Sequence, residues 1–127
     1  MGDLPFLVVD PGAGTAPYEQ VRRQLADLVG SGALAPGDRL PPIRQLAGDL
    51  GLAAGTVARA YSELEAAGLV RSRRGGGTRV ADAPPVLPAD LRDARLREQA
   101  RGYVQRVRLL GVDDQRVLDA VRTALEG

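Results

Sequence analysis

The stretch RLPPIRQLAGDLGLAAGTVARAYSELEAAGLVRSRRGGGTRV, residues 39–80, predicts two short helices followed by a two-stranded hairpin. The first helix is expected over residues 43–50 and the second over residues 54–67, because apolar residues recur there at the spacing of one buried helix face. Gly51 and Gly68 follow the two helices, and glycine commonly ends a helix in a left-handed conformation. Two helices joined by a short turn that contains glycine indicate a helix-turn-helix.

The hairpin is expected to have strands at residues 69–70 and 78–80, joined by a tip rich in arginine and glycine. Residues 69–81 contain four arginines and no acidic residue, although the net charge of the whole chain is only +1. A small DNA-binding domain needs a local basic face more than a basic total. The hairpin is therefore predicted to be a wing that contacts nucleic acid.

In order and spacing, this stretch resembles the DNA-binding domain of the GntR family of bacterial transcription regulators. The matching residues are Leu40-Pro41, Arg44, Leu46-Ala47, Leu50-Gly51, Thr56-Val57, Ala60-Tyr61, Leu64, Gly68-Leu69-Val70 and Gly77-Thr78-Arg79-Val80. The resemblance implies a fold that is mainly α with a small β-wing, a winged helix-turn-helix. The alternative is an unrelated small helical domain.

Arg44 is the first candidate for a DNA contact. It falls in the first turn of its helix, where the helix dipole disfavours a positive charge. The resemblance implies that Arg44 reaches a base in the major groove, and the guanidinium fork suits the acceptor pair of guanine. The alternative is an ion pair with a nearby Asp or Glu.

The start of the second helix departs from the family pattern, because Ala53, Ala54 and Gly55 stand where polar residues are usual. These three residues cannot read bases with hydrogen-bonding side chains, but they can touch a thymine methyl group or let the helix approach the groove closely. Thr56 matches a phosphate-contacting threonine of the family, with helix capping as the alternative. Arg59 lies one turn further along the exposed face and is expected to reach a base or a phosphate.

The wing tip supplies the remaining DNA candidates, Arg73, Arg74, Gly75, Gly76 and Gly77. Three successive glycines allow a sharp turn close to a partner surface. Arginines beside such a turn suit the negative potential of a narrow minor groove, which the wing enters or flanks in the resembled family. A solvated basic hairpin is the alternative.

Before this stretch, a short edge strand is expected over residues 6–9 and a helix over residues 16–32. Tyr18 is expected on the core face of that helix, whereas Arg22 and Arg23 are expected in solvent, where either can touch a phosphate. The predicted division of the chain is a DNA-binding domain at residues 1–82, a proline-rich linker at 83–88 and a helical tail at 89–127.

The tail predicts two amphipathic helices, one over residues 89–110 and one that starts at Asp113 or Asp114. Two such helices cannot bury their apolar stripes on each other alone, so a second copy of the chain is the expected partner. The candidate dimerisation residues are Leu96, Ala100, Tyr103, Val107, Leu110, Val117, Leu118, Val121 and Leu125. A short two-helix tail resembles the YtrA subfamily, which implies a homodimeric repressor that is often encoded beside a transporter operon.

The composition argues against an enzyme, because the chain contains no His and no Cys. The commonest general bases, nucleophiles and zinc ligands are thus missing, and neither a metal site nor a cofactor is expected. No apolar run approaches the about 20 residues that a membrane span requires, and no signal peptide is recognised. A cytoplasmic protein without a membrane partner is expected.

These observations predict a sequence-specific, DNA-binding transcription regulator. The expected form is a homodimeric repressor that binds an inverted-repeat operator in double-stranded DNA, in its own operon or in a transporter operon. The alternative is a small-molecule sensor with a ligand site between the two C-terminal helices and DNA binding as its output. The sequence does not identify the effector.

Overall fold

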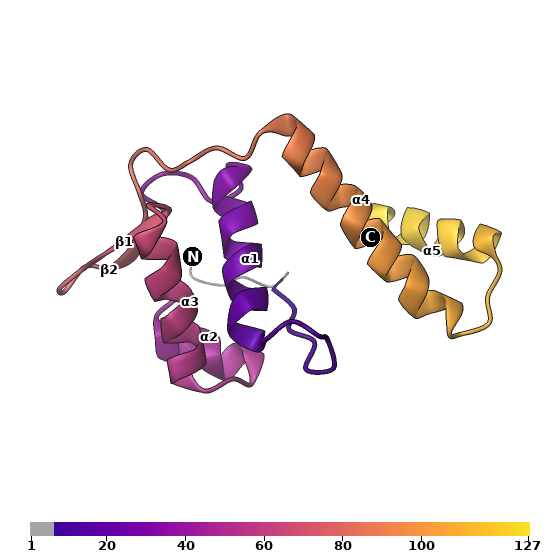
Figure 1. Ribbon diagram of the computed structural model, residues 1–127, viewed down its shortest axis with the longest axis horizontal. Helices are drawn as coiled ribbons and strands as arrows, with labels where there is room; N and C mark the ends of the chain where they lie inside the picture. Colours follow the sequence, from indigo (N-terminus) through magenta and orange to yellow (C-terminus); the bar gives the residue numbers. More distant parts are fainter. Residues whose placement is uncertain (1–6) are drawn as a thin grey trace. The chain divides into compact units, whose positions relative to one another are not determined.

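The computed structural model describes residues 7–127 (Figure 1). The chain divides into two compact units with a boundary between Leu87 and Pro88. In chain order the elements are α1 (Pro17–Gly30), α2 (Ile43–Leu50), α3 (Ala54–Ala66), β1 (Val70–Arg73), β2 (Gly77–Val80), α4 (Ala89–Arg108) and α5 (Asp114–Glu126). The predicted fold class is confirmed: helices dominate the described residues, and a β-hairpin follows the helix-turn-helix.

Local sequence explains where the helices of the first unit begin and end. Pro17 opens α1, since proline already has the backbone angle of a first helical residue. Gly51 ends α2 with a φ of 68°, and Gly68 has a φ of 80° just after α3. Both values lie in the left-handed region that residues with a Cβ avoid. Because Gly51 reverses the chain so soon, α3 begins at Ala54, and α2 and α3 meet at a short turn.

The core of the first unit is formed by α1, α2, α3 and the base of the hairpin. Its largest fully buried side chains are Leu25, Leu40, Leu46, Leu64, Val21, Val57, Val80 and Pro41. Tyr61 of α3 is buried there and donates a hydrogen bond of 2.6 Å to the carbonyl oxygen of Pro41. Burial raises the pKa of Tyr61 well above its usual range. This bond ties α3 to the segment that leads into α2.

The hairpin is antiparallel, with Val70 opposite Val80 and Ser72 opposite Thr78. Its base is held by the segment before α2, since the Leu40 amide donates to the carbonyl of Thr78 at 2.8 Å. The strands extend further toward the tip than the sequence predicted, because pairing continues to Arg73 and Gly77. The turn itself is therefore short and places the tip residues at the end of a paired ribbon.

The segment before α1 does not form the expected edge strand. Phe6 lies outside the described residues, and residues 7–9 are not paired with a strand. Side chains of α1 replace that pairing instead. The Gln24 amide donates to the Val8 carbonyl at 2.8 Å and accepts from its amide at 3.0 Å, and Gln20 does the same at Asp10. Two glutamine side chains thus satisfy the backbone groups that a neighbouring strand would have paired.

The proline-rich segment that follows the hairpin returns to α1. The Leu87 amide donates to the carbonyl of Gly30 at 2.9 Å. A Cβ added at Gly30 would lie 2.9 Å from the Cβ of Leu87, closer than real Cβ contacts. Most of the predicted linker therefore belongs to the first unit, and the boundary between the units falls between Leu87 and Pro88.

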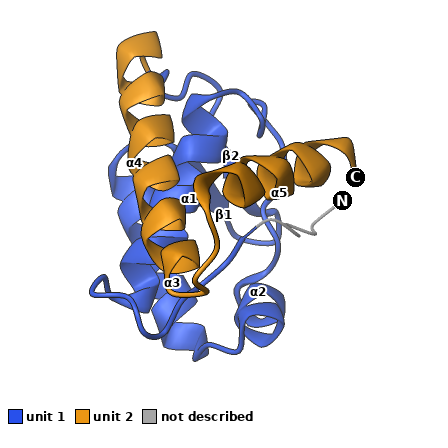
Figure 2. Ribbon diagram, turned by 90° about the vertical axis from the view of Figure 1, so that its right-hand side faces the viewer, with its two compact units in different colours: residues 1–87 blue, residues 88–127 orange. Residues whose placement is uncertain are grey.

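The second unit consists of α4 and α5, drawn in orange in Figure 2. Asp113 caps α5 by accepting a hydrogen bond of 2.9 Å from the Arg116 amide. Helix α4 ends at Arg108, two residues before the predicted Leu110. Neither helix contains a buried residue, so this unit has no core of its own.

Candidate nucleic-acid interface

Arg44 lies in the first turn of α2 and is exposed. Within residues 7–127 its guanidinium makes no ion pair and no hydrogen bond, so the alternative of a local acidic partner is not seen. The residue before the helix, Pro42, provides no side-chain cap. All five N–H donors of Arg44 are thus available at a helix terminus that already favours negative ligands.

The first turn of α3 presents almost bare backbone. Ala53, Ala54 and Gly55 are exposed, and a Cβ added at Gly55 would meet no atom within 4 Å. Ala53, at the N-cap position, makes no side-chain cap bond. The Thr56 hydroxyl has no hydrogen bond in the described part of the chain, so the capping alternative is not seen there either. A flat partner surface can therefore come close to this helix end, where the amides of Ala54 and Gly55 have no intrahelical partner, whereas the Thr56 amide donates to the Ala53 carbonyl at 3.1 Å.

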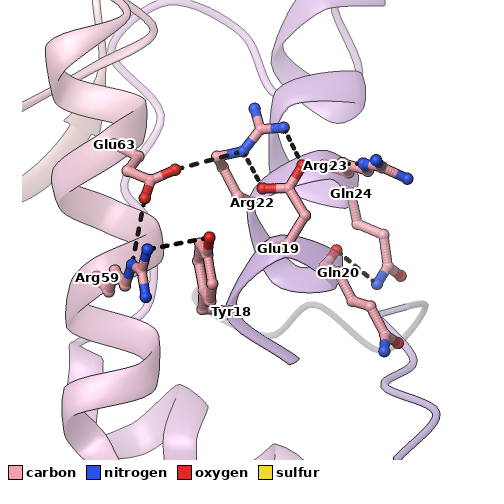
Figure 3. Close-up of polar contacts among 8 residues, drawn as sticks. All are labelled: Tyr18, Glu19, Gln20, Arg22, Arg23, Gln24, Arg59 and Glu63. Atoms are coloured by element: carbon pink, nitrogen blue, oxygen red, sulfur yellow. Dashed lines mark hydrogen bonds and ion pairs between the residues drawn. The ribbon is translucent and has the colours of Figure 1, made fainter. Parts of the chain in front are cut away.

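Arg59 is held in place by α1 rather than free on the surface. Its guanidinium carbon lies 3.7 Å from the centroid of the Tyr18 ring, and its Nη2 donates to the Tyr18 hydroxyl at 3.0 Å (Figure 3). Its Nε donates to Glu63, one turn along α3, at 3.3 Å. Tyr18, expected in the core, is half-buried and supports Arg59 instead.

A second polar cluster lies beside this one on α1. Glu19 accepts from Arg22 Nε at 2.7 Å and from Arg22 Nη2 at 2.6 Å, and from Arg23 at 3.0 Å. These donors lower the pKa of Glu19 to about 2, with the Arg22 hydrogen bond as the largest cause. Arg22 is thus half-buried and paired, contrary to its expected position in solvent.

The wing tip exposes its two central arginines. Arg73 and Arg74 have no ion pair or hydrogen bond from their side chains among the described residues. Gly75 and Gly77 have φ values of 77° and 70°, so the turn requires glycine at both positions. Gly76 completes the turn, and its amide donates to the carbonyl of Arg73 at 3.0 Å. Positive charge is thus concentrated at the end of a short, sharply turned ribbon.

The face of the hairpin that bears Arg71, Arg73 and Arg79 is more basic than the sequence indicated. These arginines line a shallow hollow with Gly76 and Gly77. Arg39 joins them from outside the hairpin, since its guanidinium would lie 3.0 Å from a Cβ added at Gly77. Sequence analysis missed Arg39 because nothing in its local pattern shows that the chain returns beside the wing.

Part of this charge is neutralised at the base of the hairpin. Arg71 donates to the carboxylate of Asp82 at 3.2 Å, just beyond the acid-free segment. Arg79 donates to the carbonyl of Gly37 at 3.2 Å. Only Arg71 of this face thus has an acidic partner among the described residues, and the uncompensated positive charge lies on Arg39 and Arg79 and, at the tip, on Arg73 and Arg74.

Other kinds of site are not indicated in the described residues. Residues 7–127 hold no group of three or more His, Cys, Asp or Glu that could bind a metal ion. In the same range, no helix is both long enough and apolar enough to cross a membrane.

A helix-turn-helix with a basic hairpin directly after its second helix defines the winged helix-turn-helix class of DNA-binding domain. The bacterial regulatory proteins of the gntR family match residues 17–80, which is this domain. The chain belongs to that family, and it is a transcription regulator and not an enzyme.

Relatives of similar length agree with this assignment. HTH-type transcriptional regulator Rv1152 of Mycobacterium tuberculosis is 46% identical over 107 residues, which are 84% of each protein. HTH-type transcriptional repressor YtrA of Bacillus subtilis is 29% identical over 117 residues, 92% of this chain and 90% of the relative. Because both matches include the tail, the chain is consistent with the YtrA subfamily.

Solved structures agree as well. YtrA from Sulfolobus acidocaldarius, a GntR-family transcription factor, is 33% identical with a TM-score of 0.57, over 74% of this chain and 97% of that one. AraR(DBD) in complex with operator ORX1 is 30% identical with a TM-score of 0.52, over 59% of this chain and 93% of that one. The second match falls on a structure that contains operator DNA.

Proposed function

We propose that this chain is a homodimeric transcription repressor that binds an inverted-repeat operator. Two relatives support the finer assignment, since YtrA of Bacillus subtilis is a repressor and AraR(DBD) was crystallised with an operator. A regulator of this kind acts in the bacterial cytoplasm, on its own operon or on a transporter operon. Each half-site of the operator is bound by one winged helix-turn-helix, and the half-sites lie about one helical turn apart.

The observation on which this proposal chiefly rests is Arg44. It is an exposed, unpaired cation at the start of α2, within the described residues, and the helix dipole makes that position unfavourable for it. An arginine at such a position gains most from an external acceptor. In a major groove the acceptor pair of a guanine matches its planar fork.

The other contacts follow from the surface around Arg44. The bare turn formed by Ala53, Ala54 and Gly55 lets α3 approach the bases closely, and Thr56 and Arg59 contact the backbone or a base edge. The wing places Arg73 and Arg74 at the minor groove, where its glycine turn, Gly75, Gly76 and Gly77, allows close approach.

The tail supplies the dimer. Leu96, Leu110, Leu118 and Leu125 are exposed to between 56% and 83% in the single chain, and neither tail helix has a buried residue. The same helices present Ala100, Tyr103, Val107, Val117 and Val121. Burying these side chains on a second copy removes apolar surface from water. It also fixes two DNA-binding units in one molecule.

The test is a titration of wild type, Arg44→Ala and Arg44→Lys against an operator duplex and a scrambled duplex at one salt concentration. The operator is first located by footprinting upstream of the chain's own gene. Arg44→Ala is expected to weaken operator binding by about 1–3 kcal/mol, the value of one bidentate base contact, and to affect the scrambled duplex much less. Arg44→Lys should restore little, because an ammonium lacks the planar fork.

The matched control is the double variant Arg73→Ala/Arg74→Ala. It should weaken binding to both duplexes to a similar extent. It should also reduce the slope of log affinity against log salt concentration, by up to about one unit for each phosphate that is no longer neutralised. If Arg44→Ala weakens binding to both duplexes equally, Arg44 contacts a phosphate and its proposed role in base recognition is wrong. If wild type binds neither duplex, the proposed function itself is wrong.

A further inference from the structure

Arg59 is the one candidate DNA residue whose side chain is fully oriented by neighbours that are themselves described. Its guanidinium lies over the Tyr18 ring, with 3.7 Å from the guanidinium carbon to the ring centroid. Two hydrogen bonds set its rotation, one to the Tyr18 hydroxyl and one to the Glu63 carboxylate (Figure 3). A long side chain with several rotatable bonds is thereby held in one arrangement.

These contacts leave the outward side of the guanidinium available. An arginine has five N–H donors, and Tyr18 and Glu63 accept from two of them, so three remain without an acceptor among the described residues. The side chain is still 60% exposed. Arg59 therefore combines a fixed orientation with unused donors on the exposed face of α3, one turn after Thr56.

We propose that Tyr18 is a positioning residue for DNA binding: it pre-orients Arg59, so that the free protein already presents the guanidinium as DNA requires it. The ordering of Arg59 is then completed during folding and does not oppose association. Immobilising a side chain of this kind on binding commonly weakens affinity by about two- to tenfold. The inference rests on the proposed function, since it assigns a role within the DNA-binding surface.

Tyr18 is better placed than Glu63 to set this orientation. Tyr18 belongs to α1, which is fixed to the core through Val21 and Leu25, both fully buried. Its ring has few rotatable bonds and offers a flat surface for the whole guanidinium. The Glu63 side chain is 40% exposed, and its other oxygen lies 3.7 Å from Arg22 Nε. Glu63 therefore divides its charge between two arginines, whereas the Tyr18 ring stacks on Arg59.

The arrangement has a second interpretation, in which Tyr18 and Arg59 only bridge α1 and α3. In that case removing either residue would loosen the packing of the two helices, and DNA binding would fall only as stability falls. The two interpretations differ in one respect. A positioning residue acts through Arg59 and loses its effect when Arg59 is absent, whereas a packing residue does not.

The experiment is a double-mutant cycle on the full-length protein, with Tyr18→Leu, Arg59→Ala and the combined variant. Each is titrated against the operator duplex, and thermal unfolding is recorded alongside. Arg59→Ala is expected to weaken binding about fivefold or more, which corresponds to the lower end of one base contact. Tyr18→Leu is expected to weaken binding about two- to tenfold in the wild-type background. In the Arg59→Ala background, the same change should alter affinity by less than about twofold, because the side chain that Tyr18 positions is absent.

Tyr18→Phe is the conservative variant. It keeps the ring beneath the guanidinium and loses only the hydroxyl acceptor, so it should retain part of the affinity that Tyr18→Leu loses. Arg22→Ala is the matched control, because it removes the other polar link between α1 and α3 and leaves the Tyr18–Arg59 contact in place. Arg22→Ala should lower the melting temperature without reproducing the coupling to Arg59.

Three results would overturn the inference. Equal effects of Tyr18→Leu with and without Arg59 would make Tyr18 a packing residue. Unchanged affinity in both single variants would make the pair a structural bridge. Tighter binding by Tyr18→Leu would mean that the contact holds Arg59 away from DNA. Failure of the proposed function is distinguished from all three, because then the wild-type protein would not bind the operator at all.

Discussion

The two units of this chain use apolar residues in opposite ways. In the first unit, α1, α3 and the hairpin base enclose side chains that are almost fully buried, such as Leu25, Leu64 and Val80. In the second unit, α4 and α5 bury no residue, and Leu110 and Leu125 are exposed to 75% and 83%. The first unit therefore contains the contacts that stabilise it, whereas the second displays exposed apolar surface of the kind that marks interaction sites.

The polar residues show the same contrast. The first unit has a connected network in which Glu19, Arg22, Glu63 and Arg59 join α1 to α3. The ion pair between Arg122 and Asp119 in the second unit lies within α5 and is more than half exposed at both ends. The difference teaches that polar contacts in the first unit connect two helices into a preformed surface, whereas the ion pair of the second unit lies within a single helix.

The largest expected effect comes from removing the second unit. A chain that ends after Leu87 should remain folded, because its core and the Leu87–Gly30 contact are intact. It should be monomeric and should bind the operator about two to four orders of magnitude more weakly, because two linked units bind far more tightly than one. Analytical ultracentrifugation of the full-length and truncated chains measures the oligomeric state, and titration with the operator duplex measures the affinity. A full-length protein that sediments as a monomer at micromolar concentration would remove the basis of the comparison.

The next effect compares one leucine from each unit. Leu64→Ala creates a cavity in a fully buried site and should lower the free energy of unfolding of the first unit by about 2–5 kcal/mol. Leu125→Ala changes an exposed site and should alter the free energy of unfolding of the first unit by no more than about 0.5 kcal/mol. It should, however, weaken the dimer. Urea denaturation, together with sedimentation, separates the two results. Similar losses of unfolding free energy would show that Leu125 lies in a core.

The smallest effect concerns the acid stability of the first unit. The folded pKa of Glu19 is about 2, below its ordinary value of 4.5, so the carboxylate stabilises the fold above pH 4.5 and loses this contribution as the pH falls toward 2. Glu19→Gln should lower the stability at neutral pH by an amount of order 1 kcal/mol, since the pair is partly solvated. It should also flatten the decline of stability between about pH 5 and pH 2.

The matched control for this change is Asp119→Asn, which removes an exposed pair within α5. Both variants are followed by urea denaturation at several pH values. An acid decline that is unchanged in Glu19→Gln would show that the α1 cluster does not contribute to the pH dependence of folding.

Much of this protein is determined by local sequence. Apolar spacing predicts α2 to the residue, and Gly51 marks its end because only glycine readily adopts the required left-handed angle. The arginines and glycines of residues 71–77 likewise predict a basic, sharply turned wing. Each of these inferences depends on composition or on residues that are neighbours in the chain.

Only the tertiary structure decided which distant residues meet. Arg39 approaches Gly77, Tyr18 lies under Arg59, and Leu87 returns to Gly30, across separations that no helix or strand period encodes. The glutamines of α1 also replaced the strand expected before it, because a side-chain amide offers the same donor and acceptor as a backbone amide. Periodicity fixes which face of an element is apolar, but the partner of each polar side chain depends on how the elements pack together.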